Sequence, residues 1–334
     1  MNGVRAACLT LAGLITIGAL ASCSARPAPP APVTTTAPPA PAATGHPGPF
    51  SGGAVRAPEA GALLGAWVRP RRLSDVERVA AVRGFEEQLG RKLAIVNTYR
   101  RLGEDFATSA DRRFLKSGAT LMVSWAVGDT RSITMGRQDD ILRDRARKLR
   151  DLGKPVMLRF RWEMDRPNLT PSIWTPQDYV EAWRHTRELF AAEGARNVAW
   201  VWCPTVEGFA AGRAGDFYPG DSAVDWICVD TYAGGTLAPF ASLMQPFVEW
   251  ASAHAKPIVV GEFGIGRGWG PQARAEWLRS AFTYVRTVPQ IKAVVYFESD
   301  PDGRDDKRSF SLSPDPVALA AFAQAATTPY FSPS

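Results

Sequence analysis

The stretch Lys154-Pro-Val-Met-Leu-Arg-Phe-Arg-Trp-Glu-Met-Asp165 decides the fold predicted for this chain. A Lys-Pro turn leads into an apolar run, Val156 to Phe160, which ends among Arg, Trp and acidic residues. The stretch Lys256-Pro-Ile-Val-Val-Gly-Glu-Phe-Gly264 repeats this pattern. A turn, an apolar run and a terminal carboxylate are typical of a buried parallel strand whose C-terminal end presents an acid. Two such strands in one barrel would place Glu163 and Glu262 across a shared cleft.

The composition fits one large enzyme-sized domain. Of 334 residues 46% are hydrophobic, which is enough for a full core. The net charge of +6 includes 33 acidic residues scattered among the basic ones, so we expect no nucleic-acid partner. With only three histidines in the chain, we expect neither a metal site nor a cofactor. We also expect a monomer.

The N-terminal residues predict export and a lipid anchor. Residues 1–22 carry one positive charge, an apolar segment and small residues, the pattern of a secretory signal. Leu20-Ala-Ser-Cys23 resembles the bacterial lipobox, which predicts lipidation of Cys23 and attachment to the outer face of the bacterial cell membrane. Ordinary signal cleavage is the alternative. Residues 23–58 are rich in Pro, Ala and Thr and predict a disordered linker.

From residue 59 to 334 strand and helix patterns alternate, which predicts a (β/α)8 TIM barrel. A doubly wound sheet would also alternate, but no phosphate-binding turn follows any strand. The clearest helix starts at Thr175-Pro176 and ends at Gly194. The predicted strands are 63–68, 92–98, 119–125, 156–160, 197–202, 225–230, 257–261 and 291–297. The predicted helices are 74–90, 105–115, 139–152, 175–194, 239–254, 271–285 and 316–326.

Two cysteines fall on consecutive predicted strands of this domain. Cys203 and Cys228 permit a disulfide in an oxidising compartment. We prefer the alternative, two buried free thiols.

Aromatic and charged residues gather at the predicted strand ends, where barrel enzymes carry their chemistry. Flat aromatic rings stack on pyranose faces, while acids and arginines hydrogen-bond to sugar hydroxyls. Packing in the core is the alternative for any single tryptophan. We expect a polysaccharide to contact Arg159, Trp162, Asp165, Trp125, Trp202, Asp230, Tyr232, Phe297 and, from a Gly-rich loop, Trp269.

Glu163 and Glu262 are the candidate catalytic pair of a glycosidase. A retaining glycosidase needs an acid and a nucleophile whose carboxyl groups are about 5 to 5.5 Å apart. Aromatic neighbours such as Trp162 would raise the pKa of the acid, and Tyr232 is the candidate hydrogen-bond donor to the nucleophile. The alternative is a structural ion pair between Glu163 and an adjacent arginine.

Four motifs resemble glycoside hydrolase family 26 over roughly residues 60–330. They are Met157-Leu-Arg-Phe-Arg-Trp-Glu-Met-Asp165, Val201-Trp-Cys-Pro204, Val224-Asp-Trp-Ile-Cys-Val-Asp-Thr-Tyr232 and Lys256-Pro-Ile-Val-Val-Gly-Glu-Phe-Gly264. That family belongs to the large retaining clan of TIM barrels and is best known for endo-β-1,4-mannanases. The resemblance implies that Glu163 is the acid/base, Glu262 the nucleophile and Tyr232 the residue that orients the nucleophile.

The chain departs from the family pattern beside the acid/base. Trp162 stands where the family usually has His, and Asp165 and Arg166 replace the usual Asn-Gly. A Trp side chain donates one hydrogen bond but accepts none. The resemblance implies a β-mannan-like substrate, and because these departures lie beside the acid/base, β-1,3-xylan and mixed-linkage β-glucan are the alternatives. A carbohydrate-binding surface lipoprotein that has lost turnover is the alternative from another class.

Overall fold

Eight parallel strands close into a barrel in the computed structural model, which describes residues 50–301 and 303–332. Each strand pairs with its neighbours in chain order, and β1 pairs with β8. The predicted TIM barrel is therefore confirmed. The predicted signal segment, Cys23 and the linker up to residue 49 lie outside the described residues. The strands are β1 (Leu63–Val68), β2 (Ile95–Arg101), β3 (Thr120–Ala126), β4 (Val156–Phe160), β5 (Val198–Trp202), β6 (Trp226–Ala233), β7 (Ile258–Ile265) and β8 (Ile291–Glu298).

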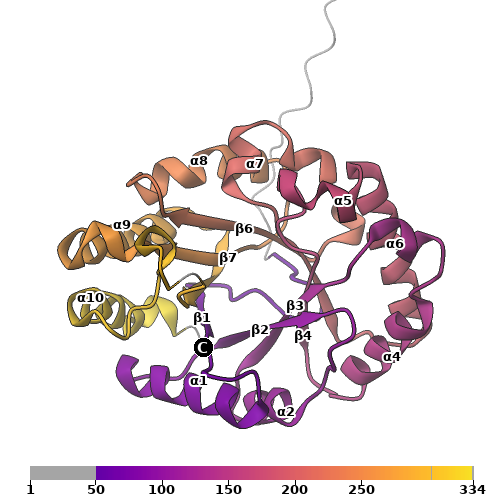
Figure 1. The fold of residues 1–334 in the computed structure, drawn as a ribbon, viewed down its shortest axis with the longest axis horizontal. Helices are drawn as coiled ribbons and strands as arrows, with labels where there is room; N and C mark the ends of the chain where they lie inside the picture. Colours follow the sequence, from indigo (N-terminus) through magenta and orange to yellow (C-terminus); the bar gives the residue numbers. More distant parts are fainter. Residues whose placement is uncertain (1–49, 302, 333–334) are drawn as a thin grey trace, which may run out of the picture. The chain divides into compact units, whose positions relative to one another are not determined.

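Helices surround the barrel on its outside (Figure 1). Sequence signals explain several of their ends: the Thr175 side chain caps α6 in a capping box with Asp178, and Gly90 ends α1 in the left-handed conformation. None of the helices in the described ranges is long and apolar enough to cross a membrane. The helices are α1 (Asp75–Leu89), α2 (Ser109–Lys116), α3 (Thr130–Thr134), α4 (Asp139–Arg150), α5 (Thr170–Ile173), α6 (Pro176–Ala192), α7 (Val206–Ala210), α8 (Phe240–Ala251), α9 (Pro271–Thr287) and α10 (Pro316–Ala326).

Alternation along each strand divides the apolar side chains between two cores. Side chains that point into the barrel, such as Met122 and Met157, form the inner core. The residues next to them in sequence, such as Val123 and Leu158, point outward and pack against the helices. Because successive side chains of a strand face opposite sides, this parity also determines which strand-end residues can reach the barrel mouth.

The N-terminal end of the barrel is closed by residues that the sequence assigned to the linker. Val55 is buried in the inner core, and the indole N–H of Trp226 donates to the carbonyl oxygens of Gly52 and Val55 at 2.9 and 3.0 Å. The expected linker boundary at residue 58 is therefore too late. The buried indole of Trp226 needs acceptors, and this segment supplies them.

Candidate active site

A cleft of about 370 Å³ lies at the C-terminal ends of the strands and contains both predicted carboxylates. Aromatic and charged side chains line it. The lining residues are Tyr99, Trp162, Glu163, Arg166, Glu207, Tyr232, Gly234, Gly235, Glu262, Phe297, Pro301, Lys307, Arg308 and Phe310.

Glu163 lies on a strained turn directly after β4. Its φ of 55° falls in the left-handed region that side chains other than glycine rarely adopt, and Arg161 has a φ of 44°. Such a conformation costs on the order of 1–3 kcal/mol and is maintained by surrounding contacts. The Glu163 N–H donates to the carbonyl of Cys203 at 2.7 Å, which ties the turn to the end of β5. The Glu163 side chain meets one cation, Arg166, at 3.2 Å.

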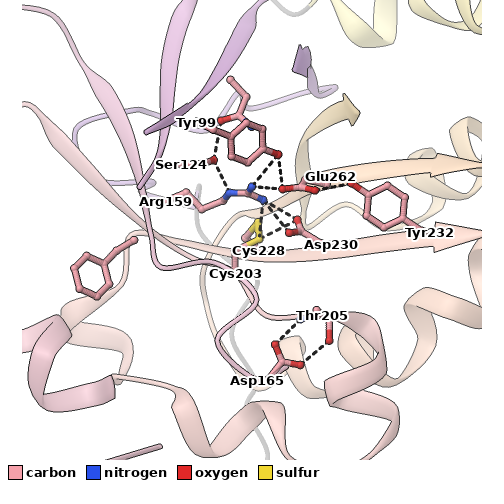
Figure 2. Close-up of a disulfide and its surroundings, with 12 residues drawn as sticks. Tyr99, Ser124, Arg159, Asp165, Cys203, Thr205, Cys228, Asp230, Tyr232 and Glu262 are labelled. Atoms are coloured by element: carbon pink, nitrogen blue, oxygen red, sulfur yellow. Dashed lines mark hydrogen bonds and ion pairs between the residues drawn. A yellow bond between two sulfur atoms is a disulfide. The ribbon is translucent and has the colours of Figure 1, made fainter. Parts of the chain in front are cut away.

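Glu262 lies within β7 and is held by three donors (Figure 2). The hydroxyl of Tyr232 donates to Oε2 at 2.5 Å, and the hydroxyl of Tyr99 donates to Oε1. The guanidinium of Arg159 also donates to Oε1. The three donors thus engage both carboxylate oxygens of Glu262 and fix its orientation.

A shift in strand register directs Glu262 into the barrel. The pairing of β6 with β7 shifts between Val229 and Asp230, and that of β7 with β8 shifts between Val260 and Phe263. Val260 and Phe263 both pack in the outer core, although a regular strand would turn residues three apart to opposite faces. Such a bulge re-aims a side chain, which explains why Glu262 faces the cleft.

Arg159 is fully buried beneath the cleft and forms ion pairs with Asp230 and Glu262. Its guanidinium donates to Asp230 at 2.8 Å and to Glu262, and its Nε donates to the hydroxyl of Ser124 at 2.8 Å. A Cβ at Gly261 would come within 2.9 Å of Arg159 Nη1, so glycine permits this approach. The expectation that Arg159 and Asp230 bind substrate directly is corrected, because both are buried and bonded to each other.

The two sides of the cleft have different protonation chemistry. Burial, followed by the nearby charge of Glu262, raises the pKa of Glu163 to about 8, so this carboxyl is protonated at neutral pH. Burial and Glu262 also raise the pKa of Tyr99 and of Tyr232 well above the ordinary value, so both phenols remain donors. Although burial opposes its charge, Asp230 and Glu262 raise the pKa of Arg159.

The carboxylates are close enough to act on one sugar ring. One carboxylate oxygen from each of Glu163, Asp230 and Glu262 lies within 4.8 Å of the other two. This separation matches a retaining pair better than an inverting pair, whose carboxyl groups are about 6.5–9.5 Å apart. Three converging acids are also a conceivable metal site, but the Arg159 guanidinium already donates to two of them. The donor set therefore does not fit a divalent cation.

Trp162 and Phe297, which we expected to contact substrate, line the cleft. The Trp162 ring centroid lies 5.0 Å from that of Tyr99, and the Arg159 guanidinium lies 5.2 Å from the Trp162 ring centroid. Such cation–π contact helps to fix the indole orientation. Trp162 thus forms one aromatic wall of the cleft beside Glu163.

Trp125 and Trp202 do not reach the cleft, and their predicted substrate contacts are wrong. Both side chains are fully buried in the outer core. Trp125 packs on Phe106 and Phe160, while the indole of Trp202 donates to the carbonyl of Phe217 at 3.0 Å. Each tryptophan is one position out of phase with the inward-facing residues of its strand.

Asp165 and Trp269, which we also expected to contact substrate, form other contacts. Asp165 accepts hydrogen bonds from the backbone N–H and the hydroxyl of Thr205 at 3.0 and 2.6 Å, apart from the Arg159 cluster (Figure 2). It therefore fastens the β4 loop to the β5 loop instead of binding sugar. Trp269 lies in the turn η4 (Arg267–Trp269), where its indole donates to the carbonyl of Gly234 at 2.9 Å, and it does not line the cleft.

Cys203 and Cys228 form a disulfide, so our preference for two free thiols is wrong. Both cysteines face the barrel interior: Cys203 directly follows β5, and Cys228 lies within the adjacent strand β6. The sequence offered two thiols on consecutive strands, but only the shared inward parity brings them together. The disulfide lies next to Arg159 and Asp230 (Figure 2).

Several cleft residues were absent from the expected set. Tyr99 has the same inward parity on β2 as Ile95 and Asn97, so strand parity was the signal that would have found it. Glu207 lies on α7, a helix for which the sequence pattern gave no signal. Lys307 and Phe310 come from the loop after β8, to which the sequence analysis assigned no role.

Comparison with known proteins relates the barrel to polysaccharide-degrading enzymes. The family model for glycosyl hydrolase family 26 matches residues 123–268, which include Glu163 and Glu262. Endoglucanase H of Acetivibrio thermocellus is 28% identical over 79% of this chain, and β-1,3-xylanase TXYA of a Vibrio species is 27% identical over 40%. The matched regions span only 30% and 29% of those two proteins.

Solved structures agree on the fold. A family 26 β-mannanase from Bacteroides ovatus superposes with a TM-score of 0.58 at 16% identity, covering 81% of this chain and 90% of that chain. A β-mannanase from a symbiotic protist of the termite Reticulitermes speratus gives a TM-score of 0.54 at 16% identity, covering 81% and 88%. At these identities the similarity extends to the barrel and not to the sugar that is bound.

Proposed function

We propose that this chain, which matches the model of glycosyl hydrolase family 26 over residues 123–268, hydrolyses a β-linked polysaccharide with retention of anomeric configuration. The observation that carries this proposal is the pairing of two close carboxyls with opposite environments. Glu163 has a pKa raised to about 8, and Glu262 accepts hydrogen bonds from Tyr99, Tyr232 and Arg159. One carboxyl is thus suited to give a proton and the other to attack as an anion.

In the first step, protonated Glu163 gives its proton to the glycosidic oxygen while a carboxylate oxygen of Glu262 attacks the anomeric carbon. The glycosidic bond breaks and a glycosyl ester forms on Glu262. In the second step, ionised Glu163 takes a proton from water, whose oxygen displaces Glu262 from the sugar. Taking this proton returns Glu163 to its protonated state, so one residue serves as acid and then as base.

The hydrogen bonds on Glu262 would change during this cycle. Before attack, Tyr99, Tyr232 and Arg159 orient the carboxylate within the cleft. In the glycosyl ester, one oxygen is bonded to sugar and the charge on the carboxyl has gone. The donors then stabilise the carboxylate as a leaving group in the second step, when its negative charge returns.

We propose β-mannan, mixed-linkage β-glucan and β-1,3-xylan as the candidate substrates. The solved structures support the first, because two of them are β-mannanases. The relatives at 28% and 27% identity support the other two, because they are an endoglucanase and a β-1,3-xylanase. Trp162 borders Glu163 in the cleft, so its indole is the side chain we expect to influence the choice of sugar.

A polysaccharide panel with product detection tests the activity. Mannan, glucomannan, xylan, β-1,3-xylan and mixed-linkage glucan would be incubated with the wild type and with Glu163→Ala/Glu262→Ala as the background. We expect soluble oligosaccharides from the wild type alone, with NMR showing the β-anomer first. Initial α-product would contradict retention, and products from the double variant would mean that other carboxylates act. Binding without turnover would favour a carbohydrate-binding protein instead.

We also propose that the protein is a lipoprotein on the outer face of the cell membrane, with the linker extending the barrel toward a polymer. The lipobox-like Leu20-Ala-Ser-Cys23 and the Pro-rich residues after it support this proposal. Labelling cells with palmitate tests it. Wild-type protein should carry label and Cys23→Ala should not, whereas an unlabelled wild type would contradict the anchor.

A further inference from the structure

A second cavity of about 430 Å³ lies beside the catalytic cleft, on the side of β1, β2 and β3. Trp162 and Tyr99 line both cavities, so these two rings form the partition between them. On the far side, Trp67 and the exposed side chain of Leu73 supply an apolar wall. The two cavities therefore adjoin each other at these two rings.

The second cavity is strongly basic. Five arginines and a single acid, Glu104, line it. Arg100 is neutralised by Asp111 at 2.8 Å, and Arg69 donates to the backbone carbonyl of Asp300 at 2.8 Å. The Glu104 carboxylate accepts from the backbone N–H of Arg101. Neither Arg71 nor the Arg101 side chain forms a salt bridge with an acid in the described ranges, so the cavity has an excess of positive charge.

Arg78 gives an independent indication of a ligand. It is only 7% exposed, yet its Nη1 has no hydrogen-bond partner among the described residues. Its guanidinium lies 5.9 Å from the Trp67 ring centroid, at the wall of the cavity. Burial, together with neighbouring Arg100, lowers the pKa of Arg78. A buried donor without a partner is costly, and an anion in the cavity would relieve both the missing bond and the repulsion.

We propose that this second cavity is a subsite for a carboxylate-bearing sugar, so that the substrate is an acidic β-glycan containing uronate residues. The apolar rings of Trp67 and Trp162 would face the sugar ring, while Arg71, Arg78 and Arg101 bind its carboxylate. This inference rests on the proposed function, because it assumes that the neighbouring cleft holds the same glycan. It adds that the substrate is negatively charged, a property that the two catalytic carboxylates do not determine.

Binding to a turnover-free protein tests the subsite separately from hydrolysis. Full-length Glu262→Gln would be titrated by calorimetry with fragments of glucuronoxylan, C6-oxidised mannan and C6-oxidised mixed-linkage glucan, each beside its carboxyl-reduced form. We expect at least one acidic fragment to bind roughly tenfold more tightly than its reduced form, as for a charge-assisted hydrogen bond. Equal affinity within every pair, or no binding of any fragment, overturns the proposal. Matching fragments that carry sulfate instead of carboxylate separate uronate recognition from general anion binding; tighter binding of the sulfated form would overturn the uronate assignment.

Variants that remove charges show which residues cause the preference for acidic fragments. In the Glu262→Gln background, Arg71→Gln/Arg101→Gln should remove most of the preference for the acidic fragment and leave the affinity for the reduced form unchanged. The matched control is Arg72→Gln, an exposed neighbour that does not line the cavity. Glu104→Gln should increase the preference, because it removes the one acid of the lining. A preference that survives the double change, or falls equally with Arg72→Gln, places the anion elsewhere.

The two proposals fail in distinguishable ways. Hydrolysis of neutral polysaccharides without any preference for acidic fragments would leave the glycosidase intact and remove the uronate subsite. Selective binding of acidic fragments without hydrolysis of any polysaccharide would keep the subsite and remove the enzyme.

Discussion

Glu163 at the end of β4 and Glu262 on β7 follow similar sequence patterns but occupy different settings. Glu262 is surrounded by two phenols and a buried guanidinium that all donate to it. The Glu163 side chain forms an ion pair with Arg166, and its backbone is strained. A Lys-Pro turn followed by an apolar run therefore delivers a carboxyl to the barrel mouth, while the neighbours on other strands decide its protonation state.

The surroundings of Glu262 and Glu163 also differ in how much they contribute to folding and to catalysis. Arg159 and Asp230 form a buried ion pair below Glu262, and hydrogen bonds to Ser124 and Tyr99 extend the network to β2 and β3. Glu163 is instead positioned by its backbone, because its N–H donates a hydrogen bond to the carbonyl of Cys203. Changes near Glu262 should therefore affect folding and nucleophilicity together, and changes near Glu163 should mainly affect proton transfer.

The largest effect is expected when either carboxyl is removed. Glu262→Ala should reduce hydrolysis of an aryl β-glycoside to background, since no covalent intermediate can form. Glu163→Ala should lower turnover of a polysaccharide by about 10²–10⁴-fold, because proton donation is lost. Adding azide identifies the roles, with products analysed by NMR. Azide should give an α-glycosyl azide with Glu262→Ala and a β-glycosyl azide with Glu163→Ala, and the opposite pattern would exchange the two assignments.

The next effect concerns stability on the Glu262 side. Arg159→Leu would leave Asp230 and Glu262 buried without their counterion, which should cost about 3–5 kcal/mol in the free energy of unfolding. Denaturant unfolding followed by tryptophan fluorescence measures this cost. The matched control is Arg83→Leu, which breaks an exposed pair with Glu87 and should change stability by no more than about 1 kcal/mol. Equal losses in both variants would contradict the role assigned to the buried cluster.

A smaller effect should follow from removing one phenol hydroxyl. Tyr232→Phe deletes the 2.5 Å donor to Glu262 and should lower kcat by roughly 10–100-fold, the value of one hydrogen bond to a charged group. Tyr330→Phe is the control, because its hydroxyl donates to the backbone of α9, outside the cleft. An unchanged kcat in Tyr232→Phe would show that this hydrogen bond does not serve the nucleophile.

The smallest effect is a displacement of the pH profile on the Glu163 side. The wild type should lose kcat/KM as pH rises through about 8, because the acid must be protonated to act. Arg166 favours the ionised form of Glu163, so Arg166→Gln should raise the pKa of that carboxyl further. The basic limb should then move to higher pH by less than about one unit, because Arg166 is exposed and screened by water. A move to lower pH would contradict the assignment of this limb to Glu163.

Much of the site could be predicted because barrel strands end at one common rim. The predicted residues that follow apolar runs in the sequence and line the cleft are Trp162, Glu163, Tyr232, Glu262 and Phe297. Trp125 and Trp202, which lie on strands, failed on parity because both face the helices. Distance along the chain from a strand end does not tell which face a side chain occupies, although counting by two from Met122 or Val201 would have done so.

The sequence by itself determined the alternation of strands and helices, and hence the barrel and the rim on which Glu163 and Glu262 lie. Those features depend on local periodicity and capping, which are properties of neighbouring residues. Only the tertiary structure decided that a register shift turns Glu262 inward, that Cys203 and Cys228 are joined, and that Arg159, Tyr99 and Asp230 meet beneath the cleft. These outcomes depend on contacts between strands far apart in the chain, whose relative register is fixed when the barrel closes.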